Sequence, residues 1–354
     1  MASKNQIVTR GVAMGGGARI PIQSMCSIAF NRFDELAAQA LALQDAGCDI
    51  LRVSFPDMES AEPFRKLHDL LRIPLVADIH YDYRLALEAM KAGADKIRIN
   101  PGNTDKTHLK LVTDEAKARQ IPIRVGVNAG SLEKDLLEKY GRPTAAALAE
   151  SAQRNVELLE QLDFYDMAVS MKSSDVRLMV DAYRIFAEKS PYPLHLGVTE
   201  AGTLRSGTVK SSVGIGALLL DGIGDTIRVS LTADPLEEVE TAKILLRSLE
   251  LYDRGIEVIS CPTCGRTTVN SIELANTVEK EFRDIRQHVK IAVMGCVVNG
   301  PGEARQADVG VTGANGEYVL FRGDKIVRHI AQKDILPLLR KEVEEIAAEK
   351  ERRQ

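Results

Sequence analysis

Three cysteines near the C-terminal end of the chain have the spacing of a metal site. Cys261 and Cys264 form a C-x-x-C pair, and Cys296 stands in the glycine-rich segment 295–302, which Glu303 follows. Two thiolates in C-x-x-C spacing can reach one metal from a single turn, and a glycine-rich loop can bend around a cluster. Three thiolates and one carboxylate therefore predict a metal centre with one weakly held oxygen ligand, at which a substrate could bind.

The spacing leaves two kinds of metal centre open. A structural zinc site normally has four Cys or His ligands, and a zinc ribbon needs a second C-x-x-C pair. Cys296 stands alone and His288 falls in the preceding turn, so zinc would have to recruit Glu303 or a distant thiol. An iron–sulfur cluster is held mostly by thiolates. The spacing favours the iron–sulfur cluster.

A second set of candidate residues is polar and alternates with apolar residues in short β-branched segments. In Leu51-Arg-Val-Ser, for example, Arg52 lies on the face opposite the apolar side chains, because residues two apart in a strand share a face. The same alternation places on one face Arg52, Ser54, Asp78, His80, Arg98, Asn100, Arg124, Asn128, Ser170, Lys172, His195, Thr199, Arg228 and Ser230.

Four arginines and a lysine on one face require an anion. Unpaired buried cations are strongly unfavourable, and the nearby carboxylates Asp78, Glu200 and Asp225 are too few to neutralise them. The planar guanidinium group suits phosphate oxygens, so we expect a diphosphate. The alternative, that each arginine reaches solvent at a strand end, is weak for four arginines in register. A second anion could bind where Ser211-Ser-Val-Gly-Ile-Gly opens a helix.

The elements that carry these residues repeat one unit, a short β-branched segment followed by an amphipathic segment with helical spacing. Eight such units over roughly 250 residues predict a (β/α)8 TIM barrel, with an open doubly wound sheet as the alternative. In a barrel the polar face points inward. The expected strands are 20–25, 50–55, 74–79, 96–100, 121–128, 166–171, 194–199 and 226–231.

The repeat stops near residues 252–255, and a small α+β module follows. We expect strands at 257–260 and 290–294, a helix at 271–287, further β segments between 308 and 329, and a final helix from about Lys333. The chain is therefore α/β, divided into a substrate-binding barrel at 1–253 and a cluster domain at 254–354.

The composition gives no general reason to bind nucleic acid or a membrane. Apolar residues make up 45% of the chain, charged residues 27%, and the net charge is −4. Without tryptophan and with few aromatic residues, the chain offers little for stacking nucleic-acid bases. The first ten residues do not resemble a signal peptide, and no segment approaches the ~20 apolar residues of a membrane span. With clustered thiols, this indicates a cytoplasmic protein.

The cysteine segments resemble those of a known family. Ser260-Cys-Pro-Thr-Cys-Gly-Arg-Thr and Met294-Gly-Cys-Val-Val-Asn-Gly-Pro-Gly-Glu-Ala are similar to the cluster motifs of bacterial 4-hydroxy-3-methylbut-2-enyl diphosphate synthases, in their short two-domain form. Segments throughout the barrel also resemble that family, so the similarity covers essentially the whole chain. They are Leu51-Arg-Val-Ser, Ala77-Asp-Ile-His, Lys96-Ile-Arg-Ile-Asn-Pro-Gly-Asn, Arg124-Val-Gly-Val-Asn-Ala-Gly-Ser, Ser170-Met-Lys-Ser-Ser-Asp, His195-Leu-Gly-Val-Thr-Glu-Ala-Gly and Asp225-Thr-Ile-Arg-Val-Ser.

The resemblance implies a [4Fe–4S] cluster held by Cys261, Cys264, Cys296 and Glu303. It implies an iron–sulfur oxidoreductase of the methylerythritol phosphate pathway of isoprene biosynthesis, acting on 2-C-methyl-D-erythritol 2,4-cyclodiphosphate. The ring is opened reductively with loss of water, giving 4-hydroxy-3-methylbut-2-enyl diphosphate, and reduced flavodoxin or ferredoxin supplies two electrons. It also implies a homodimer in which the cluster domain of one subunit caps the barrel of the other.

Each set of residues then has an expected role. We expect Glu303 to give way to the substrate, and Asp78, His80 or Glu200 to donate the proton that leaves in water. Two other functions stay open, a dihydropteroate-synthase-like barrel with a structural metal domain and a redox sensor that uses the cluster as a switch. The residues expected to bind the diphosphate are Arg52, Arg98, Asn100, Arg124, Asn128, Lys172, Arg228 and Ser230.

Overall fold

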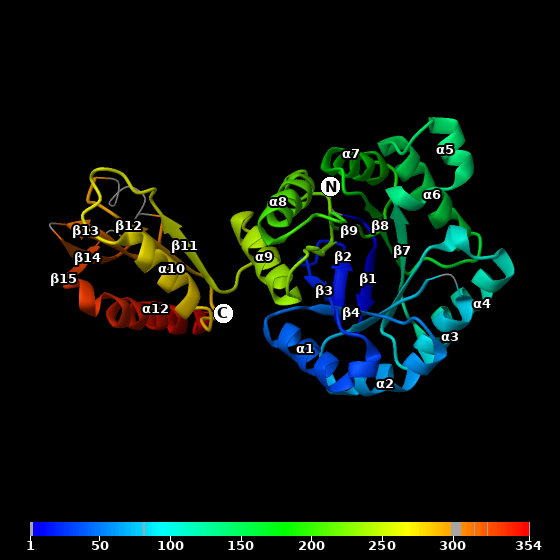
Figure 1. Cartoon of the computed structure of the whole chain (residues 1–354), viewed down its shortest axis with the longest axis horizontal. Helices are drawn as coiled ribbons and strands as arrows, with labels where there is room; N and C mark the ends of the chain where they lie inside the picture. Colours follow the sequence, from blue (N-terminus) through cyan, green and yellow to red (C-terminus); the bar gives the residue numbers. More distant parts are fainter. Residues whose placement is uncertain (1–2, 81, 299–305, 315, 324, 354) are drawn as a thin grey trace. The chain divides into compact units, whose positions relative to one another are not determined.

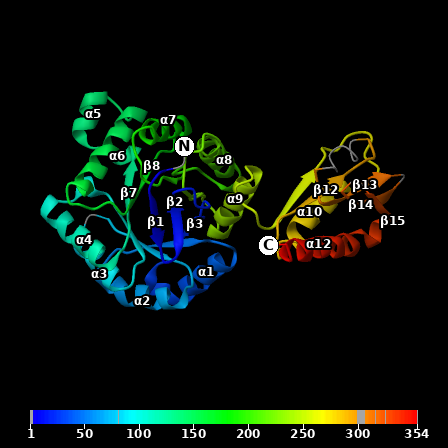
Figure 2. The same ribbon diagram turned by 180° about the vertical axis from the view of Figure 1, so that it is seen from behind.

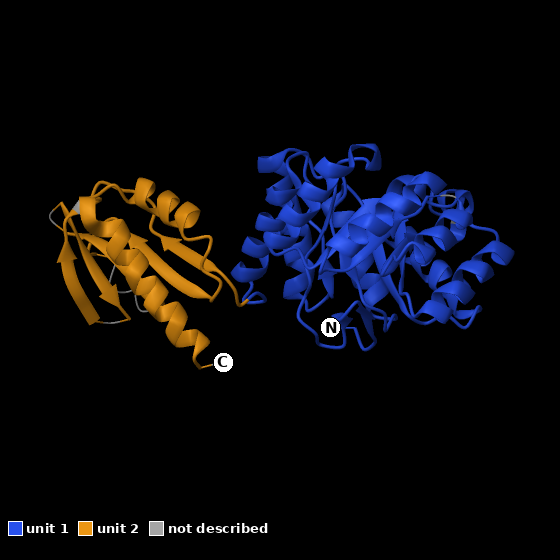
Figure 3. Cartoon of the chain, turned by 90° about the horizontal axis from the view of Figure 1, so that it is seen from below, with its two compact units in different colours: residues 1–252 blue, residues 253–354 orange. Residues whose placement is uncertain are grey.

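A computed structural model describes residues 3–80, 82–298, 306–314, 316–323 and 325–353 of the chain. It consists of two compact units, Met1–Tyr252 and Asp253–Gln354, coloured separately in Figure 3. The sequence placed the domain boundary at 253/254, and the contacts separate at 252/253. Each unit is described by itself below.

The first unit is built around eight parallel strands that close on themselves. Six strands form a continuous parallel sheet in the order β3 to β8, and β9 pairs with β10. The bridges Val169–Leu194 and Ile22–Ile227 join β8 to β9 and β10 to β3. The expected barrel is therefore confirmed. The strands are β3 (Gln23–Met25), β4 (Ile50–Ser54), β5 (Leu75–Asp78), β6 (Lys96–Ile99), β7 (Ile123–Asn128), β8 (Met167–Lys172), β9 (His195–Leu196) and β10 (Thr226–Ile227).

A helix follows each strand and packs on the outside of the barrel, as Figures 1 and 2 show. The apolar strand face, with Leu51, Val53, Ile97 and Val125, belongs to one core cluster with the apolar faces of these helices. The polar strand face is thereby left to the interior. The helices are α1 (Phe33–Asp45), α2 (Ala61–Leu70), α3 (Tyr83–Lys91), α4 (Lys106–Arg119), α6 (Ala145–Glu160), α7 (Val176–Ala187), α8 (Leu204–Leu220) and α9 (Pro235–Ser248).

Two further elements of this unit were not expected from the sequence. The hairpin of β1 (Gln6–Thr9) and β2 (Val12–Gly15) precedes the barrel. Its Ile7 and Met14 pack against Ile50, Val76 and Ala168, at the amino-terminal ends of the barrel strands. The hairpin therefore closes the bottom of the barrel. The second element is the short helix α5 (Lys134–Tyr140), between β7 and α6.

The expected helix start at residues 211–216 is wrong. Helix α8 begins at Leu204, so Gly214 and Gly216 lie inside it and their amide groups are not at a helix N-terminus. Gly214 instead permits close packing, because a Cβ atom there would lie 2.8 Å from the Val198 side chain and 2.9 Å from that of Met179. The anion site suggested for this segment therefore has no basis.

Among its described residues, the second unit forms a five-stranded sheet with two helices. The strand order is β11-β12-β13-β14-β15, with β11 to β13 parallel and the last two pairs antiparallel. Helices α10 and α12 share one core with one face of the sheet, and the opposite face carries a small cluster with Met294, Phe321 and Cys261. The elements are β11 (Ile256–Ser260), α10 (Ser271–Glu281), β12 (Val289–Met294), β13 (Val309–Ala314), β14 (Glu317–Arg322), β15 (Lys325–Ile330) and α12 (Ile335–Glu351).

Single 3-10 turns lie at Phe30–Arg32, Met58–Ser60, Pro101–Asn103, Ala129–Ser131 and Gln332–Asp334. Within the described residues, no helix combines the length and apolar character needed to cross a bilayer.

Candidate active site

The centre of the barrel interior is a carboxylate between two guanidinium groups. Arg52 Nη2 donates to Asp78 Oδ2 at 2.6 Å, and Arg98 Nη1 lies 3.4 Å from Asp78 Oδ1. The His80 ring contacts both charges, with Nε2 at 3.1 Å from Asp78 Oδ2 and Nδ1 at 3.5 Å from Arg98 Nη1. The two contacts fit together only if His80 Nε2 carries the proton and Nδ1 accepts from Arg98. Asp78 thus orients Arg52 of β4, Arg98 of β6 and His80, which follows β5.

Asp78 remains ionised at neutral pH. Burial would raise the pKa of its carboxyl group, but the His80 hydrogen bond and the charges of Arg52 and Arg98 outweigh burial and hold the pKa well below its ordinary value. A carboxyl group with such a low pKa accepts hydrogen bonds and does not deliver protons near pH 7.

Behind this group lies a layer of buried cations and one buried histidine. Arg124 is 1% exposed and donates from Nη1 to Ser170 Oγ at 3.1 Å. Burial, followed by the charges of Arg124, Arg228, Arg52 and Arg98, lowers the pKa of Lys172 well below its ordinary value. Burial and the same kind of neighbours lower the pKa of His195. Strands β7, β8 and β9 and the segment after β10 therefore direct positive or neutralised basic groups at one interior space.

Two glycines that the sequence reasoning did not single out make room for these cations. A Cβ atom at Gly126 would lie 2.5 Å from Arg98 Nε, and one at Gly197 would lie 3.0 Å from Lys172 Nζ. Both glycines face inward from β7 and from the segment after β9. The signal in the sequence was a glycine at an inward position, with an arginine or lysine at an inward position of the preceding strand.

The counter-charges are only partly those that the sequence suggested. Asp225 was expected among them, but its Oδ2 accepts from Leu194 N at 2.8 Å. Glu238 of α9 was missed, although its Oε2 lies 3.8 Å from Arg228 Nε. It lies on a helix outside the barrel strands, so strand alternation could not reveal it. Asp78 and Glu238 are two carboxylates against four arginines and Lys172, so the barrel interior keeps an excess of basic groups.

The rim of the barrel carries the remaining candidate residues. Asn100, Asn128, Thr199 and Ser230 are half-buried, and Ser54, His80 and Glu200 are exposed. Glu200 has a φ of 51°, in the left-handed region. A non-glycine residue there costs about 1 kcal/mol or more and often marks a functional position. Its carboxylate is therefore an exposed acid held in a strained loop after β9.

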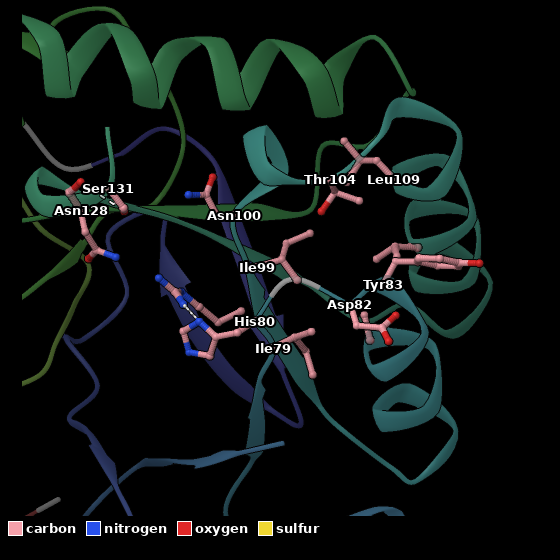
Figure 4. A pocket seen from close by; sticks show the side chains of 13 residues that line it. Ile79, His80, Asp82, Tyr83, Ile99, Asn100, Thr104, Leu109, Asn128 and Ser131 are labelled. Carbon is pink, nitrogen blue, oxygen red and sulfur yellow. Dashed lines mark hydrogen bonds between the residues drawn. The ribbon is translucent and has the colours of Figure 1, made fainter. Parts of the chain in front are cut away.

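A cavity of about 220 Å³ opens beside this rim, between the ends of β5 and β6 and helices α3 and α4. His80, Arg98, Asn100 and Asn128 line its polar part, and the other lining residues are mainly apolar. Figure 4 shows His80, Asn100 and Asn128 on one side of the strand ends, with Thr104, Leu109 and Tyr83 on the other.

The three candidate metal-binding cysteines lie in the loops that follow β11 and β12. Strands β11 and β12 run parallel with Ser260 opposite Val293, so Cys261 and the loop of Cys296 follow neighbouring strand ends. The Gly295 N–H donates to Cys261 Sγ at 3.2 Å, which ties the two loops together. All three thiols are outside disulfides and at least partly exposed. Glu303 lies outside the described residues.

Within the described part of the chain, no group of three His, Cys, Asp or Glu side chains is gathered closely enough to hold a metal ion. The donor set nevertheless suits a thiophilic group. Three unblocked sulfur atoms stand on adjacent loops, and soft thiolates select zinc, copper(I) or iron–sulfur clusters. No second C-x-x-C pair is present to complete a zinc ribbon.

At the closed end of the barrel, Lys96 is fully buried and was not singled out from the sequence. Its Nζ contacts Met14 Sδ at 3.4 Å. Burial, with the charges of Arg124 and Arg52, lowers its pKa to about 7. Nearby, both side-chain polar atoms of Gln23 and both ring nitrogens of His195 lack a hydrogen-bond partner among the described residues. This layer therefore contains buried polar and basic groups with few hydrogen-bond or charge partners among the described residues.

Comparison with known proteins agrees with both units. Residues 4–243 match the family model described as the GcpE TIM-barrel domain, and residues 257–345 match the GcpE protein C-terminal domain. The chain belongs to the GcpE family. Relatives named 4-hydroxy-3-methylbut-2-en-1-yl diphosphate synthase (flavodoxin) include those of Caldanaerobacter subterraneus (51% identical over 95% of this chain and 95% of the relative) and Geobacillus thermodenitrificans (50% identical over 98% and 93%).

Solved structures resemble the GcpE barrel in fold only. Dihydropteroate synthase from Stenotrophomonas maltophilia has a TM-score of 0.52 at 14% identity, covering 69% of this chain and 98% of its own. The enzyme from Xanthomonas albilineans in complex with 7,8-dihydropteroate has a TM-score of 0.50 at 13% identity, covering 70% and 99%. At this identity the similarity supports the barrel architecture and nothing about the reaction.

Proposed function

We propose that this protein is a 4-hydroxy-3-methylbut-2-en-1-yl diphosphate synthase, an oxidoreductase of the methylerythritol phosphate pathway that reductively opens 2-C-methyl-D-erythritol 2,4-cyclodiphosphate. Relatives about 50% identical over nearly the whole chain carry that name. The observation that carries the proposal is the barrel interior, where four arginines and a lysine face too few carboxylates. A dihydropteroate-synthase-like activity is not favoured, because only the fold is shared.

The interior cations are proposed to hold the diphosphate. Arg98 and Lys172 flank the space above Gly126 and Gly197, where side chains of other residues would collide with them. Preorganised donors of this kind position a substrate and stabilise charge that develops on its oxygens. The proposed binding set is Arg52, Arg98, Asn100, Arg124, Asn128, Lys172, Arg228 and Ser230.

The three candidate proton donors differ in what their surroundings allow. Asp78 is held ionised by Arg52, Arg98 and His80, so we assign it to orienting the arginines. His80 has both ring nitrogens engaged, with Asp78 and with Arg98. Glu200 is exposed at the rim in a strained conformation, and we propose it as the group that delivers the proton to the departing hydroxyl.

The second unit is proposed to hold a [4Fe–4S] cluster through Cys261, Cys264, Cys296 and Glu303. Such a cluster would relay, one at a time, the two electrons that the donor protein supplies for the reduction, a role that no side chain of the barrel can fill. The residues of this unit support the assignment by their chemistry, since three free thiols lie on two loops joined by the Gly295–Cys261 hydrogen bond.

Two macromolecular partners are proposed. The names of the relatives specify flavodoxin, so reduced flavodoxin is the proposed electron donor, with ferredoxin as its substitute. A homodimer is supported by an apolar stripe on α8, where Val209, Val213 and Leu220 are 60%, 57% and 76% exposed. These residues are four and seven apart and share one helix face. In the proposed dimer, the cluster domain of one subunit caps the barrel of the other.

The proposed reaction is tested by anaerobic turnover of the cyclodiphosphate with reduced flavodoxin. The expected product is 4-hydroxy-3-methylbut-2-en-1-yl diphosphate, identified by mass spectrometry. Cys264→Ser should abolish turnover and lower the iron content while leaving pyrophosphate binding to the barrel intact. Wild-type protein that binds iron fully but leaves the cyclodiphosphate unchanged contradicts the proposal.

A further inference from the structure

The cavity beside the barrel rim has two parts of opposite character. Its inner part is formed by Arg98, Asn100 and Asn128, which belong to the proposed diphosphate site. Its outer part extends between the strand ends and the helices that follow them, and none of its apolar lining residues has a role in the proposed reaction. Those residues are Ile79, Tyr83, Ala86, Ile99, Leu109 and Val112.

The outer part is a rigid apolar wall. These side chains are each less than 7% exposed and come from α3, α4, β6 and the segment after β5: Ile79, Ala86, Ile99, Leu109 and Val112. The Tyr83 ring is fixed by stacking on His108, with 4.0 Å between ring centroids and 6° between planes. A cavity lined by packed aliphatic side chains favours an apolar occupant over water.

The polar groups at the junction suit the head of an anionic ligand. Arg98 is positively charged and can donate hydrogen bonds to phosphate oxygens. Asn100 Oδ1 is a buried acceptor without a hydrogen-bond partner among the described residues, and it can accept from a hydroxyl group of a ligand but not from the anion itself. The one carboxylate of the lining, Asp82, is engaged with Arg84, whose Nη2 donates to its Oδ2 at 2.8 Å. Asp82 also accepts from the Arg84 N–H at the start of α3. It therefore does not offset Arg98.

We propose that this cavity is a side pocket for the hydrocarbon chain of linear aliphatic diphosphates, whose diphosphate group occupies the cations of the barrel. The inference rests on the diphosphate site of the proposed function and assigns a place to the carbon chain of open-chain diphosphates, the class to which the proposed product belongs. The whole cavity, its polar inner part included, has a volume of about 220 Å³ and holds roughly seven groups the size of a water molecule, at ~30 Å³ each. The outer part therefore has room for a chain of at most about five carbons.

The side pocket has a consequence for turnover. A cyclic diphosphate is compact and keeps its carbon atoms close to the phosphates, whereas an open-chain diphosphate ester extends away from them. Open-chain alkyl and alkenyl diphosphates therefore bind with one additional contact surface and compete with the cyclic substrate. The pocket makes the enzyme sensitive to its own class of product.

The experiment is a calorimetric titration of the anaerobically prepared full-length holoenzyme with inorganic pyrophosphate and with n-alkyl diphosphates from methyl to octyl. Each buried methylene group should increase affinity about fourfold, as expected for transfer of one CH2 from water. The gain should stop when the pocket is full, near five carbons. The same compounds should inhibit turnover competitively, in the same order of chain length.

Two matched variants locate the effect. Thr104 lines the pocket and is half-buried, so Thr104→Phe should fill the space, remove the dependence on chain length and preserve the affinity for pyrophosphate. Leu111 lies on the same helix as Leu109 but is 47% exposed and outside the pocket lining. Leu111→Phe should leave both the dependence on chain length and the affinity for pyrophosphate unchanged.

The outcomes separate this inference from the proposed function. Pyrophosphate binding with no dependence on chain length, or with a dependence that survives Thr104→Phe, overturns the side pocket and leaves the diphosphate site intact. Failure of pyrophosphate and of every alkyl diphosphate to bind contradicts the diphosphate site itself, and the side pocket falls with it.

Discussion

Replacing Asp78 with asparagine should destabilise the barrel substantially. Asp78 is 2% exposed and lies between Arg52 and Arg98 at 2.6 Å and 3.4 Å. Removing one partner of a buried ion pair typically costs about 3–5 kcal/mol, because the other charge stays buried without compensation. For a domain of this size, 1 kcal/mol shifts Tm by roughly 2–4 °C, so Asp78→Asn should lower the Tm of the barrel by about 6–20 °C.

The assay is thermal unfolding with and without inorganic pyrophosphate. Pyrophosphate should recover part of the lost stability, because it supplies the missing negative charge and at 100 times its Kd adds about 2.7 kcal/mol by mass action. The matched control is Asp45→Asn, which removes an exposed carboxylate 3.2 Å from Arg72, where both side chains are more than two-thirds exposed. That surface pair should matter by less than about 1 kcal/mol.

The pH dependence of folding stability is an independent test of the role of Asp78. The folded pKa of Asp78 is depressed, so its contribution to stability is present above the ordinary carboxyl pKa and is lost as the pH falls toward its folded value. Wild-type protein should lose stability steeply below about pH 4, and Asp78→Asn less steeply. An Asp78→Asn variant as stable as wild type at pH 7, with unchanged acid sensitivity, would refute the account of the arginine cluster.

Three other perturbations probe the same interior. Gly126→Ala should displace the Arg98 guanidinium, whose Nε would lie 2.5 Å from the new Cβ atom, and weaken pyrophosphate binding measured by calorimetry at least tenfold, whereas Gly130→Ala, with open space around it, should not. Lys96→Met should stabilise the protein by about 3–5 kcal/mol at pH 7, because the lysine takes up a proton near pH 10.5 in the unfolded chain but only near pH 7 when buried. In urea unfolding, the wild-type protein should become more stable between pH 7 and 9.5, and Lys96→Met should not show this gain. Pyrophosphate binding should take up protons, because the anion raises the lowered pKa of Lys172. Calorimetry in buffers of different ionisation enthalpy should detect this uptake, and Lys172→Met should reduce it, with any remainder due to His195 and Lys96, whose pKa values are also lowered.

Strand alternation was sufficient to predict the barrel interior. Arg52, Asp78, Arg98 and Arg124 were assigned to the inward face from their spacing alone, and all four are less than 9% exposed. Period two decides which face a residue occupies, and an apolar face must be buried against helices. The strand positions therefore fixed the inward residues without knowledge of contacts.

Features that depend on long-range packing could not be predicted in this way. Glu238 reaches Arg228 from a helix, and the hairpin 6–15 closes the barrel through contacts with strands far along the chain. The start of α8 was misplaced because two glycines resembled a turn, although Gly214 is required for packing against Val198. The spacing of residues within one segment gives no information about contacts with residues that are distant in the chain.

The central claim is that the cations inside the barrel bind the diphosphate of the substrate. The most direct measurement is a crystal structure of the anaerobic protein with 2-C-methyl-D-erythritol 2,4-cyclodiphosphate bound. Phosphate oxygens are expected within hydrogen-bond distance of Arg98, Arg124 and Lys172. Phosphate groups located outside the barrel, with these three side chains still facing one another, would contradict it.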